Sequence, residues 1–428
     1  MTVRGAPMSS TLSLGHCRLH LRPQPHLHRA ALTVALRGGP RVEGPREEGL
    51  THFLEHMLFR GAGPWRDARE LLGACEELGE DPEAWTGDDA LVVSLLVDPD
   101  RAGEALGLLG QLLSAPRYAD LERERAVIME ERLERVDARG DPSDLDDLTR
   151  AAAFAGHPLA RSIVGSLPAL RRVQRAHLER WRRRLVQSGN LVVVAAGAFD
   201  PRALRAAAGA WRAVPAGPAL PATPLGLPPA RSAWSAQDGS AQVELRFCLP
   251  GPGVAHPRYP ELVALADVLD GGPTARVPTA LVDAGLCYHA RADLTAFPEL
   301  SLLELELAVE REKLPRAVKA ALEVLASPGR GVTREELARA ALRRAHRARG
   351  TKDDALELAE WTAHRLVWGL PADLERERAR VDAVDPAGVS ALARAVCRPE
   401  RLVAVMLGAP GATQRRAARR ALREWSPA

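Results

Sequence analysis

Short apolar runs that have the composition of β-strands occur at matching places in the two halves of the chain. Residues 29–38 and 242–251 are rich in apolar residues and end in a glycine, which is typical of a buried strand followed by a turn. Near the end of each half, the strand-like runs 191–197 and 402–408 also end in a glycine. The end glycines of the two pairs differ by 251 − 38 = 213 and 408 − 197 = 211 positions. Offsets this similar predict two homologous halves.

Longer segments between these strands carry apolar residues three or four positions apart, as amphipathic helices do. We predict helices over the ranges 102–113, 121–136, 168–185, 335–349 and 354–368. Each half is therefore expected to be α+β, with its strands gathered in one sheet and its helices stacked on that sheet.

A proline-rich stretch separates the two halves. Residues 213–240 contain six prolines and show no apolar period, which is typical of an extended linker. At 428 residues, the chain is also too long for one ordinary hydrophobic core. We therefore expect an N-terminal domain over residues 1–214, a linker over 215–240 and a C-terminal domain over 241–428.

Charge and composition argue against several classes of protein. The 58 Lys and Arg residues nearly balance the 55 Asp and Glu residues, so nucleic-acid binding has no support. No apolar stretch of about 18 residues occurs and no leader sequence is evident, so we expect no membrane association and a cytoplasmic location. The five cysteines include no Cys-x-x-Cys pair and are expected to be reduced thiols. No nucleotide-binding or serine-nucleophile motif is present.

Residues 49–61 combine a helical apolar face with side chains that bind metals. His52 and His56 are four positions apart, so a helix places both imidazoles on one side, one turn apart. Catalytic zinc typically has three protein ligands and a bound water molecule. Glu55 directly precedes His56, close enough to take a proton from the zinc-bound water as the general base. The His-x-x-Glu-His motif therefore predicts a Zn²⁺ site that catalyses hydrolysis.

The third ligand is expected on a separate helix. Glu124 and Glu131 are seven positions apart, two turns along one face of the segment 121–136. One carboxylate would bind zinc, and the other would support the site. Each pattern alone has a simpler explanation, because the motif can arise by chance among 12 histidines and glutamate pairs are common on solvated helix faces. Together, and in this order, they predict a metal centre.

These residues resemble the insulinase/pitrilysin (M16) family of zinc metallopeptidases, in the short branch that includes the β subunit of the mitochondrial processing peptidase. Further stretches that resemble the family, in the same order, are 25–28, 157–161, 163–165, 190–197, 270–272 and 285–288. The resemblance implies two homologous halves, each a mainly antiparallel sheet covered by helices, with the active site in the first. It also implies that the chain forms half of a clamshell, as a homodimer or as a heterodimer with a homologous subunit.

Carried over position by position, the resemblance assigns a role to each residue of the motif. It implies that zinc is bound by His52, His56 and Glu131, that Glu55 is the base and that Glu124 is the supporting carboxylate.

The resemblance also implies how a peptide substrate binds. Substrates of this family add a strand to a sheet edge, here the residues Glu83, Ala84, Trp85 and Thr86. Glu83 stands where the family usually has Asn, so an amide that donates and accepts is replaced by a carboxylate that only accepts. Tyr288 matches a tyrosine that donates a hydrogen bond to the oxyanion of the scissile carbonyl.

We predict a zinc-dependent endopeptidase that hydrolyses peptides or unfolded polypeptide segments. The alternative is a partner-dependent or non-catalytic subunit of a heterodimeric complex, because the arginine that normally precedes the family's tyrosine is absent. Asp283 is the only charged residue among positions 281–284. Relatives that have become structural subunits usually lose the histidine motif, whereas this chain keeps it.

Overall fold

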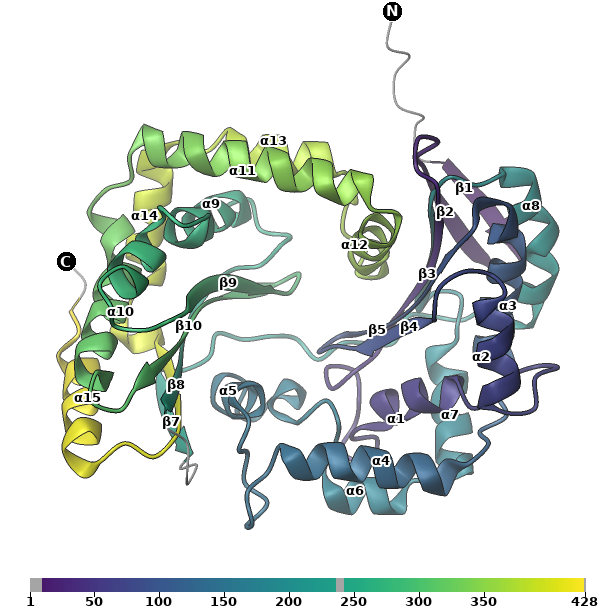
Figure 1. Ribbon diagram of the computed structural model, residues 1–428, viewed down its shortest axis with the longest axis horizontal. Coiled ribbons are helices and arrows are strands. Elements are labelled where there is room, and N and C mark those ends of the chain that lie inside the picture. The colour runs from purple at the N-terminus through teal and green to yellow at the C-terminus, as the bar shows by residue number, and fades with distance from the viewer. Residues whose placement is uncertain (1–9, 236–241, 427–428) are drawn as a thin grey trace, which may run out of the picture. The chain divides into compact units, whose positions relative to one another are not determined.

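The computed structural model describes residues 10–235 and 242–426, and Figure 1 shows their helices and strands. The chain divides into two units, each built on one sheet. The first unit comprises the residues up to Arg132, 161–223 and 349–372, and the second comprises 133–160, 224–348 and 373 onwards.

A six-stranded sheet with the order β1-β2-β6-β3-β5-β4 forms the first unit. Its strands are β1 (Ser10–Leu14), β2 (Cys17–Pro23), β3 (Ala30–Arg37), β4 (Glu83–Thr86), β5 (Ala90–Val97) and β6 (Leu191–Gly197). β2 and β6 are parallel, and the other neighbouring strands are antiparallel. β4 therefore lies at one edge of the sheet, beside the buried strand β5.

Helices cover both faces of this sheet. They are α1 (Leu50–Leu58), α2 (Ala68–Glu76), α3 (Ala102–Ser114), α4 (Leu121–Glu134), α6 (Leu167–Arg172), α7 (Arg175–Leu185), α8 (Pro201–Ala206) and α12 (Ala355–Val367), with 3-10 segments at Pro99–Arg101 and Ala207–Ala213. Alternate residues of β3 point to opposite faces. Leu32, Val34 and Leu36 belong to the core that contains α1 and α3, whereas Ala31 and Ala35 pack against α12. The small alanine side chains let α12 approach the sheet closely.

The second unit has a five-stranded sheet with the order β7-β11-β8-β10-β9. Its strands are β7 (Arg231–Ser235), β8 (Gln242–Pro252), β9 (Ala290–Ala296), β10 (Leu300–Glu310) and β11 (Val403–Leu407). β7 and β11 are parallel and the other pairs are antiparallel. This repeats the order and directions of β2-β6-β3-β5-β4 in the first unit, which confirms the predicted duplication and the α+β fold of mainly antiparallel sheets.

Helices also lie on both faces of the second sheet. They are α5 (Leu145–Ala153), α9 (Tyr259–Asp270), α10 (Leu314–Arg330), α11 (Arg334–Asp353), α13 (Leu374–Asp382), α14 (Pro386–Val396) and α15 (Ala412–Glu424), with short turns at Pro158–Ala160, Pro278–Val282 and Pro399–Arg401. α5 packs on β11, β7 and β8, and Asp146 on α5 accepts a hydrogen bond of 2.6 Å from Arg246 of β8. α9, α10 and α14 contribute to the core on the other face.

The domains predicted at 1–214 and 241–428 stay a prediction, and each of the two units combines stretches from both halves of the chain. The N-terminal half contributes α5 to the second unit, and the C-terminal half contributes α12 to the first. In the predicted linker 215–240, residues 216–230 carry no helix or strand and β7 follows them, while residues 236–240 lie outside the described residues. β1 and β2 precede the strand that the sequence pattern indicated first.

The helix predicted over 168–185 is two helices, α6 and α7. The chain is extended at Val173, with φ −60° and ψ 131°. The Arg125 guanidinium donates to the carbonyl oxygens of Leu170 and Val173, each at 2.6 Å. Carbonyl groups at the break are thus satisfied by a side chain from α4 instead of by the next helical turn.

Two findings bear on the sequence-based expectations about chemistry and location. All five cysteines are free, and four of them are buried. Among residues 10–235 and 242–426, no helix has both the length and the apolar character needed to cross a membrane.

Candidate metal centre

The helix that carries the histidine motif begins in an unusual way. α1 starts after Gly49, which offers no side chain to cap the helix. Instead, the Glu43 carboxylate accepts hydrogen bonds from the backbone N–H groups of Gly49 and Thr51, both at 2.9 Å. These amides have no partner within the helix, and a negative charge there also suits the helix dipole. Burial raises the pKa of Glu43 to about 7, and its hydrogen bonds with Thr51 and Gly49 oppose part of this effect.

The start of α1 also packs against another backbone segment. Gly49 has φ +75° and Gly165 has φ +90°. A Cβ atom added to Gly49 would lie 2.5 Å from the carbonyl oxygen of Val164. Thr51 lies in the first turn of the helix and accepts hydrogen bonds from Gly39 N at 3.0 Å and Trp181 Nε1 at 3.2 Å. The N-terminus of α1 is therefore fixed by contacts with residues distant in sequence.

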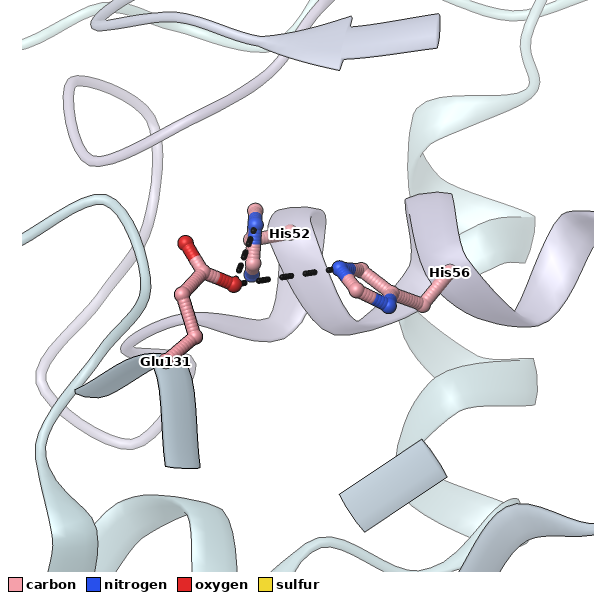
Figure 2. Close-up of side chains that lie close together, drawn as sticks. All are labelled: His52, His56 and Glu131. Atoms are coloured by element: carbon pink, nitrogen blue, oxygen red, sulfur yellow. Dashed lines mark ion pairs between the residues drawn. The ribbon is translucent and has the colours of Figure 1, made fainter. Parts of the chain in front are cut away.

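His52, His56 and Glu131 come together where α1 and α4 meet. Glu131 Oε2 lies 3.5 Å from His52 Nε2 and 4.0 Å from His56 Nε2. The two ring centroids are 4.8 Å apart, and one potential ligand atom from each residue lies within 4.8 Å of the other two. Figure 2 shows the carboxylate of Glu131 beside both imidazoles.

This donor set fits a catalytic zinc ion. Two imidazole nitrogens and one carboxylate oxygen are a known ligand set for zinc that retains a position for water. Donors about 2.1 Å from a tetrahedral zinc ion lie roughly 3.4 Å from one another. The 3.5 Å and 4.0 Å separations around Glu131 are close to that value. The role of these residues as ligands stays a prediction.

Glu124 lies on the other side of His56. Its Oε2 is 3.3 Å from His56 Nδ1, and its Oε1 is 2.5 Å from Arg60 Nη2. The side chain of Glu124 is only 2% exposed. The sequence pattern could not decide which of the two carboxylates binds the metal. Glu131 faces Nε2 of His52 and of His56, whereas Glu124 faces Nδ1 of His56. This arrangement suits the supporting role that the resemblance implied for Glu124.

Glu55, the predicted base, lies between His52 and His56 along α1 and is half-buried. The Thr86 hydroxyl donates a hydrogen bond to Glu55 Oε2. Burial raises the pKa of Glu55 above its ordinary value, and the hydrogen bond from Thr86 opposes part of this rise. A carboxylate in this state is a stronger base than a solvated one.

The residues predicted to bind substrate form the whole of β4. Ala84 packs against the core on the α1 side of the sheet, and Thr86 contacts Glu55 on that side. Trp85 points to the other face, where its Nε1 lies 3.4 Å from Glu360 Oε2 of α12. Glu83 is exposed. As an edge strand, β4 suits the predicted addition of a peptide, and that role stays a prediction.

Tyr288 belongs to the second unit and precedes β9. Its side chain is 94% exposed, and its predicted role at the oxyanion stays a prediction. The sequence pattern missed Glu43, Arg60 and the bond between Thr86 and Glu55. Glu43 lies six positions before Gly49, outside any helical spacing, and gave no signal. Arg60 is one charged residue after the motif, which is too common a feature to single it out.

Two models of known protein families match this chain, and the predicted site residues discussed above lie within the stretches that they match. The model of the family described as "Insulinase (Peptidase family M16)" matches residues 19–167. The model described as "Peptidase M16 inactive domain" matches residues 172–343.

Individual relatives extend over most or part of the chain. An uncharacterized zinc protease of Mycobacterium tuberculosis is 29% identical over 420 residues, which cover 95% of this chain and 94% of that protein. The β subunit of the mitochondrial-processing peptidase of Lentinula edodes is 31% identical over 197 residues, 46% of this chain and 41% of that protein. The crystal structure of a protease from Helicobacter pylori is similar with a TM-score of 0.84 at 18% identity, over 95% of this chain and all (100%) of that chain, so the two share a fold.

Proposed function

Because the chain belongs to the M16 family of peptidases, we propose that it is a zinc-dependent endopeptidase that hydrolyses peptides or unfolded polypeptide segments. The observation that supports this most is the cluster of His52, His56 and Glu131, whose potential ligand atoms lie within 4.8 Å of one another. Glu55 adds a basic carboxylate on the same helix as the two histidines.

The proposed chemistry assigns each side chain a step. When bound, zinc lowers the pKa of a water molecule to about 7 and polarises the scissile carbonyl. Thr86 donates its hydrogen bond to Glu55 Oε2, which leaves Oε1 to accept a proton from the attacking water. The same oxygen then passes the proton to the nitrogen of the departing amine. Partial burial favours this uptake because it raises the pKa of Glu55.

The proposed substrate site is the edge of β4. A peptide added there would form backbone hydrogen bonds with the strand, and its alternate side chains would point to opposite faces of the sheet. On one face they would meet α1 and the metal centre, and on the other they would lie beside Trp85, which contacts Glu360. Glu83 offers only acceptors at the exposed end of the strand, so we expect it to favour substrate groups that donate hydrogen bonds.

A partner-dependent enzyme is the second candidate. The segment 281–284 has Asp283 as its only charged residue and lacks the arginine expected there, and Tyr288 is 94% exposed. The matches to an inactive-domain model and to a β subunit also favour a chain that works with a homologous partner. In this version the chain supplies the zinc site, and a second subunit supplies the missing arginine.

A peptide-library digest with a Glu55→Gln variant tests the proposal. The zinc-loaded parent should cleave peptides and should stop when a chelator removes the metal. Glu55→Gln should keep the zinc content, measured by atomic emission, and lose at least about 100-fold in rate, since a positioned base contributes about 10²–10⁴-fold. Glu130→Gln is the matched control, because Glu130 is exposed on α4 next to Glu131.

The outcomes separate the two candidates. Cleavage by Glu55→Gln at the parent rate, or cleavage by metal-free protein, would rule out the proposed mechanism. A parent that binds zinc but cleaves only after a homologous subunit is added would establish the partner-dependent enzyme.

A further inference from the structure

A line of three charged or polar side chains leads from the metal centre to the loop after α1. His56 Nδ1 lies 3.3 Å from Glu124 Oε2, and Glu124 Oε1 lies 2.5 Å from Arg60 Nη2. Glu124 is 2% exposed, whereas Arg60 is 26% exposed and lies at the solvent end of the line. The two oxygens of one buried carboxylate thus contact a histidine on one side and an arginine on the other.

The burial of Glu124 explains why an arginine is needed. An ionised carboxylate in an enclosed site is costly unless a counter-charge and hydrogen bonds compensate for its lost hydration. Removing one partner from such a pair leaves the other charge uncompensated, which costs more than replacing both. Without Arg60, the carboxylate of Glu124 would be driven to turn away from its buried position and so lose its contact with His56.

The orientation of His56 depends on that contact. A histidine ligand holds its metal-binding nitrogen in the unprotonated form when the other nitrogen donates its hydrogen to a carboxylate. Glu124 Oε2 lies 3.3 Å from His56 Nδ1, and an ionised carboxylate can only accept a hydrogen bond. This contact therefore favours the tautomer with the hydrogen on Nδ1 and the lone pair on Nε2, which lies 4.0 Å from Glu131 Oε2.

Backbone hydrogen bonds around Arg60 hold the end of α1 beside the start of α4. Ala119 N donates to the carbonyl oxygen of Arg60 at 3.0 Å, and Arg117 N donates to that of Gly61 at 2.8 Å. These bonds join the end of α1 to the turn that leads into α4. In that turn Tyr118 and Asp120 have positive φ values of 53° and 56°, which non-glycine residues adopt only when their surroundings enforce it. Glu124, one turn into α4, is thereby held opposite His56.

We propose that Arg60 is a positioning residue of the metal centre, which acts through Glu124 to orient His56 Nε2 toward the zinc ion. This inference rests on the proposed zinc site and adds to it a residue that does not contact the metal or the substrate. It concerns metal binding itself, so it can be tested without measuring peptide cleavage.

The test measures the zinc dissociation constant by competition with a chromogenic chelator, together with the visible absorption spectrum of the Co²⁺-substituted protein. Arg60→Met keeps the aliphatic stem, removes the charge and should weaken zinc binding by about 10–100-fold, as loss of a supporting contact does. It should also change the Co²⁺ spectrum, because His56 would be reoriented. Arg60→Lys restores the charge and should bring zinc affinity back to within a few-fold of the parent. Arg66→Met is the matched control, since Arg66 is exposed and pairs only with Glu70 among the contacts described.

A double variant shows whether Arg60 acts through Glu124. Glu124→Gln alone should weaken zinc binding, and Arg60→Met combined with Glu124→Gln should be no weaker than Glu124→Gln alone, because both changes break the same line of contacts. If Arg60→Met does not fold, Arg60→Gln is measured against the same criteria.

The inference is overturned if Arg60→Met keeps the zinc affinity and the Co²⁺ spectrum of the parent. It is also overturned if the double variant loses as much zinc affinity as the two single variants together. Failure of the proposed function would appear differently. The parent itself would then bind zinc no more tightly than a His52→Ala variant does.

Discussion

Replacing Glu43 with glutamine should change how the stability of the protein depends on pH. Glu43 is buried, and its two oxygens accept backbone hydrogen bonds from Gly49 and Thr51 at the start of α1. Burial raises its pKa to about 7, from an ordinary value of 4.5. Between these two pH values the unfolded chain has released the proton while the folded protein still holds it. Raising the pH through this window therefore favours unfolding.

The magnitude follows from the distance between the two pKa values. The gap of 7 − 4.5 = 2.5 pH units, at about 1.4 kcal/mol per unit, corresponds to about 3 kcal/mol of stability. This contribution is complete below about pH 4.5, is lost as the pH rises to about 7 and stays lost above it. Glutamine does not titrate, so the free energy of unfolding of the parent should fall by about 3 kcal/mol relative to the variant between pH 4.5 and 8.

The variant also has a cost that does not depend on pH. The glutamine amide turns an NH₂ group toward one of the two backbone donors and leaves that donor without an acceptor, which costs about 1–3 kcal/mol. The parent should therefore be about 1–3 kcal/mol more stable than the variant at pH 4.5 and no more stable than the variant near pH 8.

Urea unfolding of both proteins, followed by tryptophan fluorescence across this pH range, measures the difference. A chelator prevents zinc binding from adding to the stability of either protein. Protonation of the histidines affects the free energy of unfolding of both proteins equally, so it cancels in the difference. Glu76→Gln, an exposed change at the end of α2, controls for the loss of one negative charge. A stability difference between Glu43→Gln and the parent that stays constant from pH 4.5 to 8 would refute the linkage.

Two further substitutions test the support of Glu55 and of α1. Thr86→Val should lower the turnover number about tenfold without changing zinc affinity, because Glu55 loses the hydrogen bond that orients it; Thr86→Ser should keep the rate, and equal rates for the two variants would contradict this. Gly49→Ala should destabilise the protein by at least about 2 kcal/mol, because the left-handed conformation disfavours alanine and the new methyl group would lie 2.5 Å from the Val164 carbonyl oxygen. Gly107→Ala, a change inside α3 that meets nothing within 4 Å, should instead stabilise by up to about 1 kcal/mol, and thermal unfolding of both variants would reveal any failure of this contrast.

The sequence predicts those parts of the protein that depend on local spacing. His52 and His56 share one helical turn, and Glu124 and Glu131 share one face of the next long helix, because helical geometry alone fixes such pairs. The strand β3 was visible because a nearly continuous apolar run marks a strand buried on both faces. The strand β8 was visible because its apolar residues alternate at Val243, Leu245 and Phe247. The constant offset between the halves then indicated the duplication that the matching strand orders confirm.

Features that depend on distant residues were not visible in the sequence. The pattern of α12 showed a helix but not the sheet that it covers, because this depends on the path of the chain. The break between α6 and α7 depends on Arg125, 45 positions before Leu170. The cap of α1 by Glu43 likewise depends on how the loop before the helix folds back, and no residue spacing encodes that fold.

Three glutamates around the candidate metal centre have different surroundings, which suit them to different roles that the sequence alone does not distinguish. Glu124 contacts a cation, Arg60, so its charge is compensated and suits the orientation of a ligand. Glu55 accepts a hydrogen bond from a neutral hydroxyl, that of Thr86, and burial raises its pKa, so it suits the transfer of a proton. Glu131 faces two imidazole nitrogens, where a bound cation would complete its environment. Residues of one chemical type thus come to suit three proposed tasks because each has a different partner, and the partner is supplied by the fold.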